Sequence, residues 1–357
     1  MLRQIATDPY LSRYDVILVD EVHERHITGD FLLAILKRLI AVRKDIKIIL
    51  MSATINTKLF QEYFKAPILT IPGRAFPVRI EYIPLENDDR RRGQETRGNE
   101  TRSILNQSKG ERIKPEPYVK ILERIDESVS SDERGDLLIF VSGMNEISTL
   151  ADELEAYATF TRRWIILRLH SSLSVADQET VFDIAPDGVR KCIIATNIAE
   201  TSVTIDQIRF IVDSGKVKEI GHDFIAGFSR LSEFWISKSS ATQRTGRAGR
   251  TGPGECYRMY SRSDFESFNE FPIPEILRIP LESIILELAC LNLGSPKEFD
   301  FIERPSDDSV LKSIERLSDI GCLDENECIT DLGRIISSLP LDIHLAKMLV
   351  YGNVPYL

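Results

Sequence analysis

The sequence predicts an α/β protein with two domains built on parallel sheets, followed by a small helical module that resembles a winged helix. Short apolar segments alternate with helical patterns along most of the chain, which is typical of parallel sheets covered by helices. Several of these apolar segments end directly in polar or charged side chains. From Ile276 onward the pattern is helical only.

Composition and length narrow the class of protein. A chain of 357 residues is long enough for two or three domains, and 43% hydrophobic with 28% charged residues is ordinary for globular protein. It contains no run of about 18 apolar residues and no secretory signal, so we expect no membrane association and a place in the nucleus or cytoplasm. The net charge of −10 argues against nucleic-acid binding by general basicity, although it allows a local basic groove.

The five cysteines are odd in number, widely spaced and without a C-x-x-C pair. We therefore expect reduced thiols and no zinc site. They are Cys192, Cys256, Cys290, Cys322 and Cys328.

An acidic loop follows the first predicted strand. Val16–Val19 is a short apolar run that indicates a strand buried on both faces. Asp20 and Glu21 come next, at the carboxyl end of the strand, where open α/β sheets bind ligands. Asp20 is placed to hold a metal such as Mg²⁺, and Glu21 to orient or deprotonate a water, which is the pairing that nucleotide hydrolysis needs. These residues alone fit an acidic surface loop equally well.

A second strand is expected at 47–51, after helical spacing over 30–40. This order predicts a right-handed parallel crossover, which brings Ser52 and Thr54 to the same sheet edge as the acidic loop. Their hydroxyls could hydrogen-bond the carboxylates or His23, and capping the next helix is an equally good role. We assign residues 1–83 to this first domain.

The following segment, 84–116, is interpreted as a flexible insertion. Asn87–Lys114 is polar, mixed in charge and almost free of large apolar residues. Its Arg90–Arg92 run could touch RNA, but a solvated charge run is the better explanation.

A second α/β domain is assigned to 117–275. Three of its predicted strands end in residues that could bind phosphate or do chemistry, which suggests a ligand face at one sheet edge. The strands are expected at 136–141, 164–169, 191–196 and 208–213. The first three end in Ser142-Gly143, His170-Ser171-Ser172 and Thr196-Asn197.

An arginine-rich motif, QRTGRAGR, occupies 243–250. If 239–250 is helical, Gln243, Arg247 and Arg250 share one face. The two glycines would each weaken such a helix by about 1 kcal/mol relative to alanine, so we expect close backbone approach to a neighbour or ligand. Guanidinium groups pair well with phosphate, and these arginines are candidates to complete a phosphoryl-transfer site. A salt-bridged surface helix is the alternative.

Residues 276–340 are expected to form the winged-helix-like module. Its helical patterns cover 281–293, 308–320 and 331–339, with a turn at 324–327. A further helix begins at Ile343, and because the chain stops at Leu357 we expect a truncated C-terminus.

Taken together, the motifs resemble those of the DEAH/RHA-type (DExH-box) RNA helicases of superfamily two. The resemblance covers nearly the whole chain except 87–114, and the variant motif with Val22 is most similar to the type associated with nonsense-mediated mRNA decay. The motifs, in family order, are DEVH at 20–23, SAT at 52–54, FVSGMNEI at 140–147, ATNIAETSVTID at 195–206 and QRTGRAGR at 243–250.

This resemblance implies an ATP-dependent RNA helicase that couples hydrolysis to translocation and unwinding. It implies two RecA-like domains, the first incomplete, then a winged helix and the start of a ratchet domain at 341–357. ATP and Mg²⁺ would be the cofactors, and RNA, as a single strand or a duplex with an overhang, the main partner. Proteins of mRNA decay or of ribonucleoproteins would be further partners of a monomer.

The resemblance also assigns roles to residues. Asp20 and Glu21 would hold Mg²⁺ and activate water, His23 would link the first site to Gln243 or to the second domain, and Ser52 and Thr54 would couple ATP state to domain motion. Ser202, Thr204 and Asp206 would face the nucleotide, and Gln243, Arg247 and Arg250 its γ-phosphate. Ser142, Gly143, Thr196 and Asn197 would lie along the RNA backbone, and 213–237 would supply a strand-separating hairpin.

One family motif is missing. The sequence has no G-x-x-x-x-G-K-[ST] loop, and its Gly215-Lys216 pair is followed by Val217, which has no hydroxyl for a metal. We therefore expect a fragment or an incomplete gene model, in which Met1 is an internal methionine and which turns over no ATP by itself. The alternative is a genuine short product that binds RNA or protein without catalysis.

Overall fold

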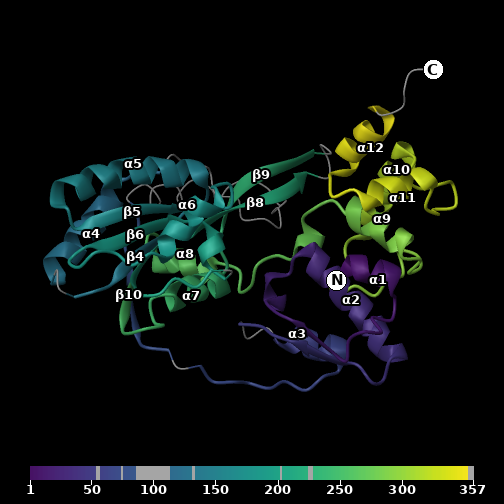
Figure 1. Cartoon of the computed structure of the whole chain (residues 1–357), viewed down its shortest axis with the longest axis horizontal. Helices are drawn as coiled ribbons and strands as arrows, with labels where there is room; N and C mark the ends of the chain where they lie inside the picture. The colour runs from purple at the N-terminus through teal and green to yellow at the C-terminus, as the bar shows by residue number, and fades with distance from the viewer. Residues whose placement is uncertain are drawn as a thin grey trace, which may run out of the picture. The chain divides into compact units, whose positions relative to one another are not determined.

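The computed structural model describes residues 1–53, 57–73, 75–85, 113–130, 133–201, 203–223 and 228–352. These fall into two compact units (Figure 1). Unit 1 comprises Met1–Leu69, Ile220–Arg230 and Ile273–Leu357, and unit 2 comprises Thr70–Glu219 and Leu231–Pro272. Most of the expected insertion at 84–116 lies outside the described residues, as do Thr54 and Ser202.

Unit 2 contains a six-stranded parallel sheet in the order β3-β10-β7-β4-β6-β5. The four strands expected from the sequence are confirmed to within a residue at either end. Their bounds are Asp136–Phe140 (β4), Trp164–Leu169 (β5), Arg190–Ala195 (β6) and Ile208–Asp213 (β7). The helices and 3-10 turns between them and before β4 are α4 (Glu116–Ser128), α5 (Met144–Thr161), α6 (Val175–Glu179), η2 (Thr180–Phe182) and η3 (Asn197–Ala199).

The centre of this sheet is buried on both faces. Leu137 and Ile139 of β4 pack against α4 and α5, which cover one face (Figure 1). Leu138 and Phe140 point to the other face and pack with Ala199 and neighbouring apolar side chains. Alternate side chains of β4 therefore belong to two hydrophobic cores, one on each face of the sheet. This is expected for a parallel sheet with both faces covered.

The predicted domain boundary at residue 83 is wrong. Val78–Tyr82 forms strand β3, which pairs with β10 (Gly254–Arg258) at the edge of the unit 2 sheet, with Ile80 opposite Cys256. The first unit accordingly ends at Leu69. The partners of this pairing are far apart in sequence, so nothing local to residues 78–82 shows which sheet the strand joins.

Unit 1 contains the short parallel pair β1 (Val16–Val19) and β2 (Lys47–Leu50), joined through α2 (Ile27–Val42). The predicted parallel pairing through a helix is confirmed, but the burial predicted for both faces of the first strand is wrong. Ile17 is 2% exposed, whereas Leu18 on the opposite face is 59% exposed. Only one face of the β1–β2 sheet is covered. Ile17 on that face packs with α2, whereas no element among the described residues covers Leu18 on the other face.

Helices dominate the rest of unit 1. Its remaining N-terminal helices are α1 (Leu2–Thr7), η1 (Val22–Glu24) and α3 (Thr57–Phe64), and its C-terminal ones are η4 (Glu275–Leu277), α9 (Glu282–Cys290), α10 (Asp307–Ile320), α11 (Asp331–Ser338) and α12 (Ile343–Gly352). Gly321, at φ 86°, ends α10 in the left-handed conformation that favours glycine. A bridge between Leu323 and Ile329 closes a small wing before α11. The expected helical module is therefore present.

Two further strands, β8 (Lys216–Asp223) and β9 (Phe228–Trp235), form a separate two-stranded sheet, where the sequence predicted a hairpin (Figure 1). After β9 come α7 (Lys238–Gly246) and α8 (Arg262–Ser267). Among the described residues, no helix has the length and apolar character needed to cross a membrane.

Candidate functional site

The acidic loop and the Ser-Ala segment leave the unit 1 sheet side by side. Val19 pairs with Leu50 in parallel register, so the residues after both strands emerge at one edge. The Val22 amide donates to the Met51 carbonyl at 3.1 Å, which joins the two loops directly. The expected meeting of Asp20 and Glu21 with Ser52 at this edge is confirmed.

Glu21 has a strained backbone. Its φ of 53° and ψ of 35° lie in the left-handed region, which costs a non-glycine residue roughly 1–3 kcal/mol and often marks functional sites. Its amide donates to Asp20 Oδ1 at 2.8 Å, and its side chain is 39% exposed. The turn therefore presents both carboxylates at the surface, close to the strand end.

His23 connects the two loops. Its ring is buried, and Nδ1 lies 3.3 Å from Glu21 Oε2 and 3.4 Å from the Ala53 amide. Its Nε2 atom is buried and has no partner among the described residues. A buried ring nitrogen without a hydrogen-bond partner destabilises the folded state. This atom is therefore a natural hydrogen-bonding point for a further group.

The donors of the acidic loop suit Mg²⁺. Asp20 and Glu21 offer carboxylate oxygens, which this hard cation prefers, and Mg²⁺ is commonly held by one or two carboxylates together with water and phosphate oxygens. The described residues contain no cluster of three or more side chains that could hold a metal alone. The loop therefore provides carboxylate oxygens for part of the Mg²⁺ coordination shell, and water and phosphate oxygens would complete it.

In unit 2 the arginine motif is only partly helical. Helix α7 ends at Gly246, Arg247 is its C-terminal cap, and Arg250 follows in a turn. The predicted helix over 239–250 is therefore too long. The close approach expected of the glycines holds for Gly249, where an added Cβ would lie 2.7 Å from the Phe76 carbonyl oxygen, but not for Gly246, which has nothing within 4 Å.

Arg247 and Arg250 both contact the loop that follows β6. Arg247 is buried and donates from Nε to the Glu200 carbonyl at 2.8 Å and from Nη1 to the Val203 carbonyl at 2.7 Å. Exposed Arg250 donates to Thr204 Oγ1 at 2.9 Å. Arg247 therefore braces the loop in this structure, while Arg250 stands at the surface with Thr204.

The remaining predicted nucleotide residues are accessible to different degrees. Gln243 is half-buried on α7, and Asp206 is exposed at the end of the Glu200–Asp206 loop. The structure thus brings Thr204, Asp206, Arg247 and Arg250 into one region of unit 2.

Sequence reasoning missed Arg244, the centre of a buried charge network. It donates to Asp213 Oδ1 at 2.8 Å and to Glu200 Oε2 at 3.0 Å, and its guanidinium lies over the Phe140 ring. Burial alone would lower the pKa of Arg244, but the two carboxylates outweigh it and raise that pKa. The signal in the sequence was Asp213 at the end of an apolar strand, a charge that needs a buried partner.

The four residues expected along RNA lie at the carboxyl edge of the unit 2 sheet, because Phe140 pairs with Ala195 in parallel register. Ser142 is buried and donates to Glu233 Oε1 at 2.7 Å. Gly143, the N-cap residue of α5, and Thr196 are also buried, so Asn197 is the exposed member of the set.

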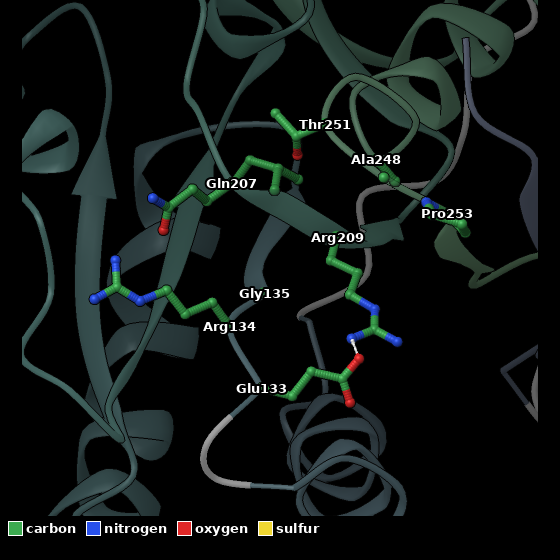
Figure 2. Close-up of a pocket in the computed structure, with 10 residues that line it drawn as sticks. Glu133, Arg134, Gly135, Gln207, Arg209, Ala248, Thr251 and Pro253 are labelled. Atoms are coloured by element: carbon green, nitrogen blue, oxygen red, sulfur yellow. Dashed lines mark hydrogen bonds and ion pairs between the residues drawn. The ribbon is translucent and has the colours of Figure 1, made fainter.

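A cavity of about 400 Å³ opens at the opposite, amino-terminal edge of this sheet. Figure 2 shows its Glu133–Arg209 ion pair, with Gln207 and Thr251 nearby. None of the predicted site residues lines it.

Comparison with known proteins agrees with this arrangement. The family model of the helicase conserved C-terminal domain matches residues 119–252, and that of the winged-helix helicase associated domain (HA2) matches 313–341. The chain is 51% identical over 355 residues to a mouse protein named probable ATP-dependent RNA helicase DHX34, and 50% identical to the human one. The crystal structure of the Escherichia coli DEAH/RHA helicase HrpB superposes with a TM-score of 0.81 at 30% identity, covering 98% of this chain and 41% of that one. By sequence and fold, this chain is similar to the DEAH/RHA helicases.

Both comparisons cover only part of the relatives. The chain is matched over 99% of its length but spans 30% of the mouse and human proteins. The bovine ATP-dependent DNA/RNA helicase DHX36 is 36% identical, over 99% of this chain and 39% of that protein.

Proposed function

We propose that this chain supplies the metal- and water-binding loop and the arginine motif of an ATP-dependent RNA helicase. The observation that carries the proposal is the acidic loop. Asp20 and Glu21 stand at the carboxyl end of a parallel strand, beside the Ser52 segment, and Glu21 contacts His23. The relatives' names, which include ATP-dependent RNA helicases, support it.

In this proposal Asp20 and Glu21 hold Mg²⁺, and Glu21 accepts a proton from the attacking water. Mg²⁺ supplies charge neutralisation on the phosphoryl oxygens. Thr204, Asp206 and Arg250 face the nucleotide from unit 2, together with Gln243. Arg247 acts by holding the Glu200–Val203 loop in place, and His23 joins the acidic loop to the Ser52–Ala53 segment.

RNA is the proposed partner, held by its backbone at the carboxyl edge of the unit 2 sheet. Backbone contacts carry little base information, so we expect weak sequence preference. Proteins of mRNA decay are proposed as further partners because the motifs resemble those of the helicase type associated with nonsense-mediated mRNA decay.

The absent G-x-x-x-x-G-K-[ST] loop favours the second candidate, in which this polypeptide binds RNA without turning over ATP. Backbone amides and the lysine of such a loop are what cradle the β- and γ-phosphates. The complete motif does not occur within these 357 residues. We therefore expect the isolated chain to bind RNA and to show no RNA-stimulated hydrolysis.

Fluorescence anisotropy with a labelled single-stranded RNA tests the RNA part. Asn197→Ala should weaken binding about three- to tenfold, as expected for loss of one or two hydrogen bonds. Thr251→Ala, at the opposite sheet edge, is the matched control and should bind like the parent chain. Equal binding by both variants would remove Asn197 from the RNA face, and no binding by the parent chain would remove RNA from the proposal.

A chimera in which this chain replaces the matched region of the mouse relative tests the hydrolytic part. Glu21→Gln should abolish RNA-stimulated turnover while ATP still binds. The control is Glu62→Gln, an exposed carboxylate of α3 in the same unit. Full turnover by the Glu21→Gln chimera would rule out the role given to Glu21.

A further inference from the structure

The acidic loop contains a second strained residue, whose role the proposed function does not explain. Arg25 has φ 53° and ψ 37°, nearly the same left-handed geometry as Glu21, and the two residues flank the short helix Val22–Glu24. Each such conformation costs a non-glycine residue roughly 1–3 kcal/mol and persists only where the surroundings hold it. The loop therefore needs anchors outside itself.

Arg25 is anchored through both its side chain and its backbone. Its guanidinium is buried and bonds to Asp30, with Nε–Oδ1 at 3.0 Å, and to Glu303, with Nη2–Oε2 at 3.1 Å. Its carbonyl accepts a hydrogen bond from the Glu275 amide at 3.1 Å. Two of these three partners come from the segment that encloses α9, far along the chain but within the same unit.

His26 makes a second connection to that segment. Its Nδ1 lies 3.1 Å from Glu275 Oε1 and its Nε2 lies 3.0 Å from Glu24 Oε2. The other oxygen of Glu275 accepts from the Ile27 amide at 2.9 Å, so this carboxylate also caps the N-terminus of α2, where negative charge is favoured. The N-cap residue, His26, makes no side-chain capping bond of its own.

The electrostatics fit a charged bridge. Hydrogen bonds to Glu24 and Glu275 raise the pKa of His26 to about 10, so the imidazole is protonated between two carboxylates. Burial alone would raise the pKa of Glu275, but His26 and the Ile27 amide lower it overall. Arg278, 3.5 Å from Glu275, adds a further positive charge.

We propose that Arg25 and His26 are positioning residues that tie the Asp20–Glu21 loop to the Glu275–Glu303 segment, which thereby sets the loop's strained backbone geometry. The group formed by Arg25, His26, Asp30, Glu275 and Glu303 is called here the loop-anchoring cluster. It touches neither Asp20 nor Glu21 directly. It acts by fixing the residues at which the acidic turn ends, and so couples the loop to the helical module that contains α9.

The consequence for hydrolysis rests on the proposed function, but the anchoring is tested without nucleotide. Amide hydrogen exchange of the purified chain is compared for the parent, Glu275→Gln and His26→Gln. Exchange in peptides covering residues 20–30 should be about tenfold faster in both variants, the size expected when a charged hydrogen bond is lost. Peptides of α10 and of the unit 2 sheet should be unchanged.

Asp300→Asn is the matched control. It removes the 2.7 Å Lys37–Asp300 bond, which also joins α2 to the 299–303 stretch but does not touch the loop. Exchange in 20–30 should stay at the parent level. Equal exchange in Glu275→Gln and Asp300→Asn, or a uniform increase over all of unit 1 in Glu275→Gln and His26→Gln, would overturn the proposal.

Histidine NMR gives a readout that general loosening of the fold would not produce. The His26 imidazole should titrate near pH 10 in the parent, move toward its ordinary range near 6.5 in Glu275→Gln, and be largely restored in Glu275→Asp. Titration of His26 near pH 6.5 in the parent chain would contradict a charged bridge from Glu24 through His26 to Glu275. If the chain failed to bind RNA, or the chimera failed to hydrolyse ATP, the proposed function would be wrong. The exchange and NMR results would still test the anchoring of the loop.

Discussion

Arg244 donates a 2.8 Å hydrogen bond to Asp213, and both side chains are fully buried. Tyr260 completes the arrangement by donating to the other Asp213 oxygen at 2.9 Å. The pair joins α7 to the end of β7, so it ties the arginine motif to the carboxyl edge of the sheet.

Removing one partner of this pair should destabilise unit 2 strongly. Arg244→Ala leaves Asp213 as an uncompensated buried charge, for which we expect a loss of about 3–5 kcal/mol in the free energy of unfolding. The protein's tryptophans, Trp164 and Trp235, both lie in unit 2, so denaturant titration followed by tryptophan fluorescence measures that unit. Arg262→Ala breaks an exposed pair with Glu266 and should cost at most about 1 kcal/mol. Similar losses for both variants would contradict the special role of Arg244.

The two glycines of the arginine motif should respond in opposite ways. Gly249→Ala would place Cβ against the Phe76 carbonyl and should destabilise unit 2 by about 1–3 kcal/mol, as overpacking does. Gly246→Ala meets open space at the end of α7 and should be neutral or stabilising by up to about 1 kcal/mol. The same fluorescence titration checks both, and a neutral Gly249→Ala variant would contradict the close approach.

Replacing Arg247 should affect the stability of unit 2, whereas replacing Arg250 at the surface should not. Arg247→Gln loses the hydrogen bonds to the Glu200 and Val203 carbonyls and should lower the melting temperature of unit 2 by several degrees, taking about 1 kcal/mol per lost bond. Arg250→Gln loses one exposed bond and should leave the melting temperature unchanged. Because Arg250 is proposed to face phosphate, its replacement should still reduce turnover in the hydrolysing chimera.

The pH dependence of unit 1 should follow His26. Its pKa is raised in the folded state, so protonation stabilises that state fully below the unfolded value near 6.5, and the benefit is lost as pH rises toward 10. Hydrogen exchange of α2 peptides, corrected for the intrinsic rate at each pH, should show protection falling across this window. The loss should be absent in His26→Gln and retained in His344→Gln, which changes an exposed histidine of α12. A parent curve identical to that of His26→Gln would contradict the assignment.

Thiol reactivity should separate the cysteines by burial. Burial raises the pKa of the Cys256 thiol to about 12 and also raises that of Cys192, so neither forms the reactive thiolate near neutral pH. Cys328 is exposed on the turn before α11. Mass spectrometry after brief iodoacetamide treatment at pH 8 should find Cys328 modified first, and Cys192 and Cys256 only after unfolding. Early labelling of Cys192 would contradict its burial in the sheet.

Local sequence determined the secondary elements and the position of the candidate residues on them. Strands at 136–140 and 164–169 follow from short apolar runs, and α10 ends where Gly321 can adopt a positive φ. Parallel register then places residues after adjacent strands at one edge, which is why the meeting of Asp20 with Ser52, and of Ser142 with Asn197, was predictable.

Tertiary structure alone decided which partners those residues take. Whether β3 joins the first or the second sheet depends on pairing with β10 across a long stretch of chain, and no pattern within 78–82 encodes that choice. The same holds for Arg244 with Asp213, and for Arg25 and His26 with Glu275 and Glu303: their charges are visible in the sequence, but their partners are brought together only by packing. Hydrophobic periodicity fixes which face of an element is buried, whereas a buried charge is satisfied by whichever opposite charge the completed fold places within hydrogen-bond distance.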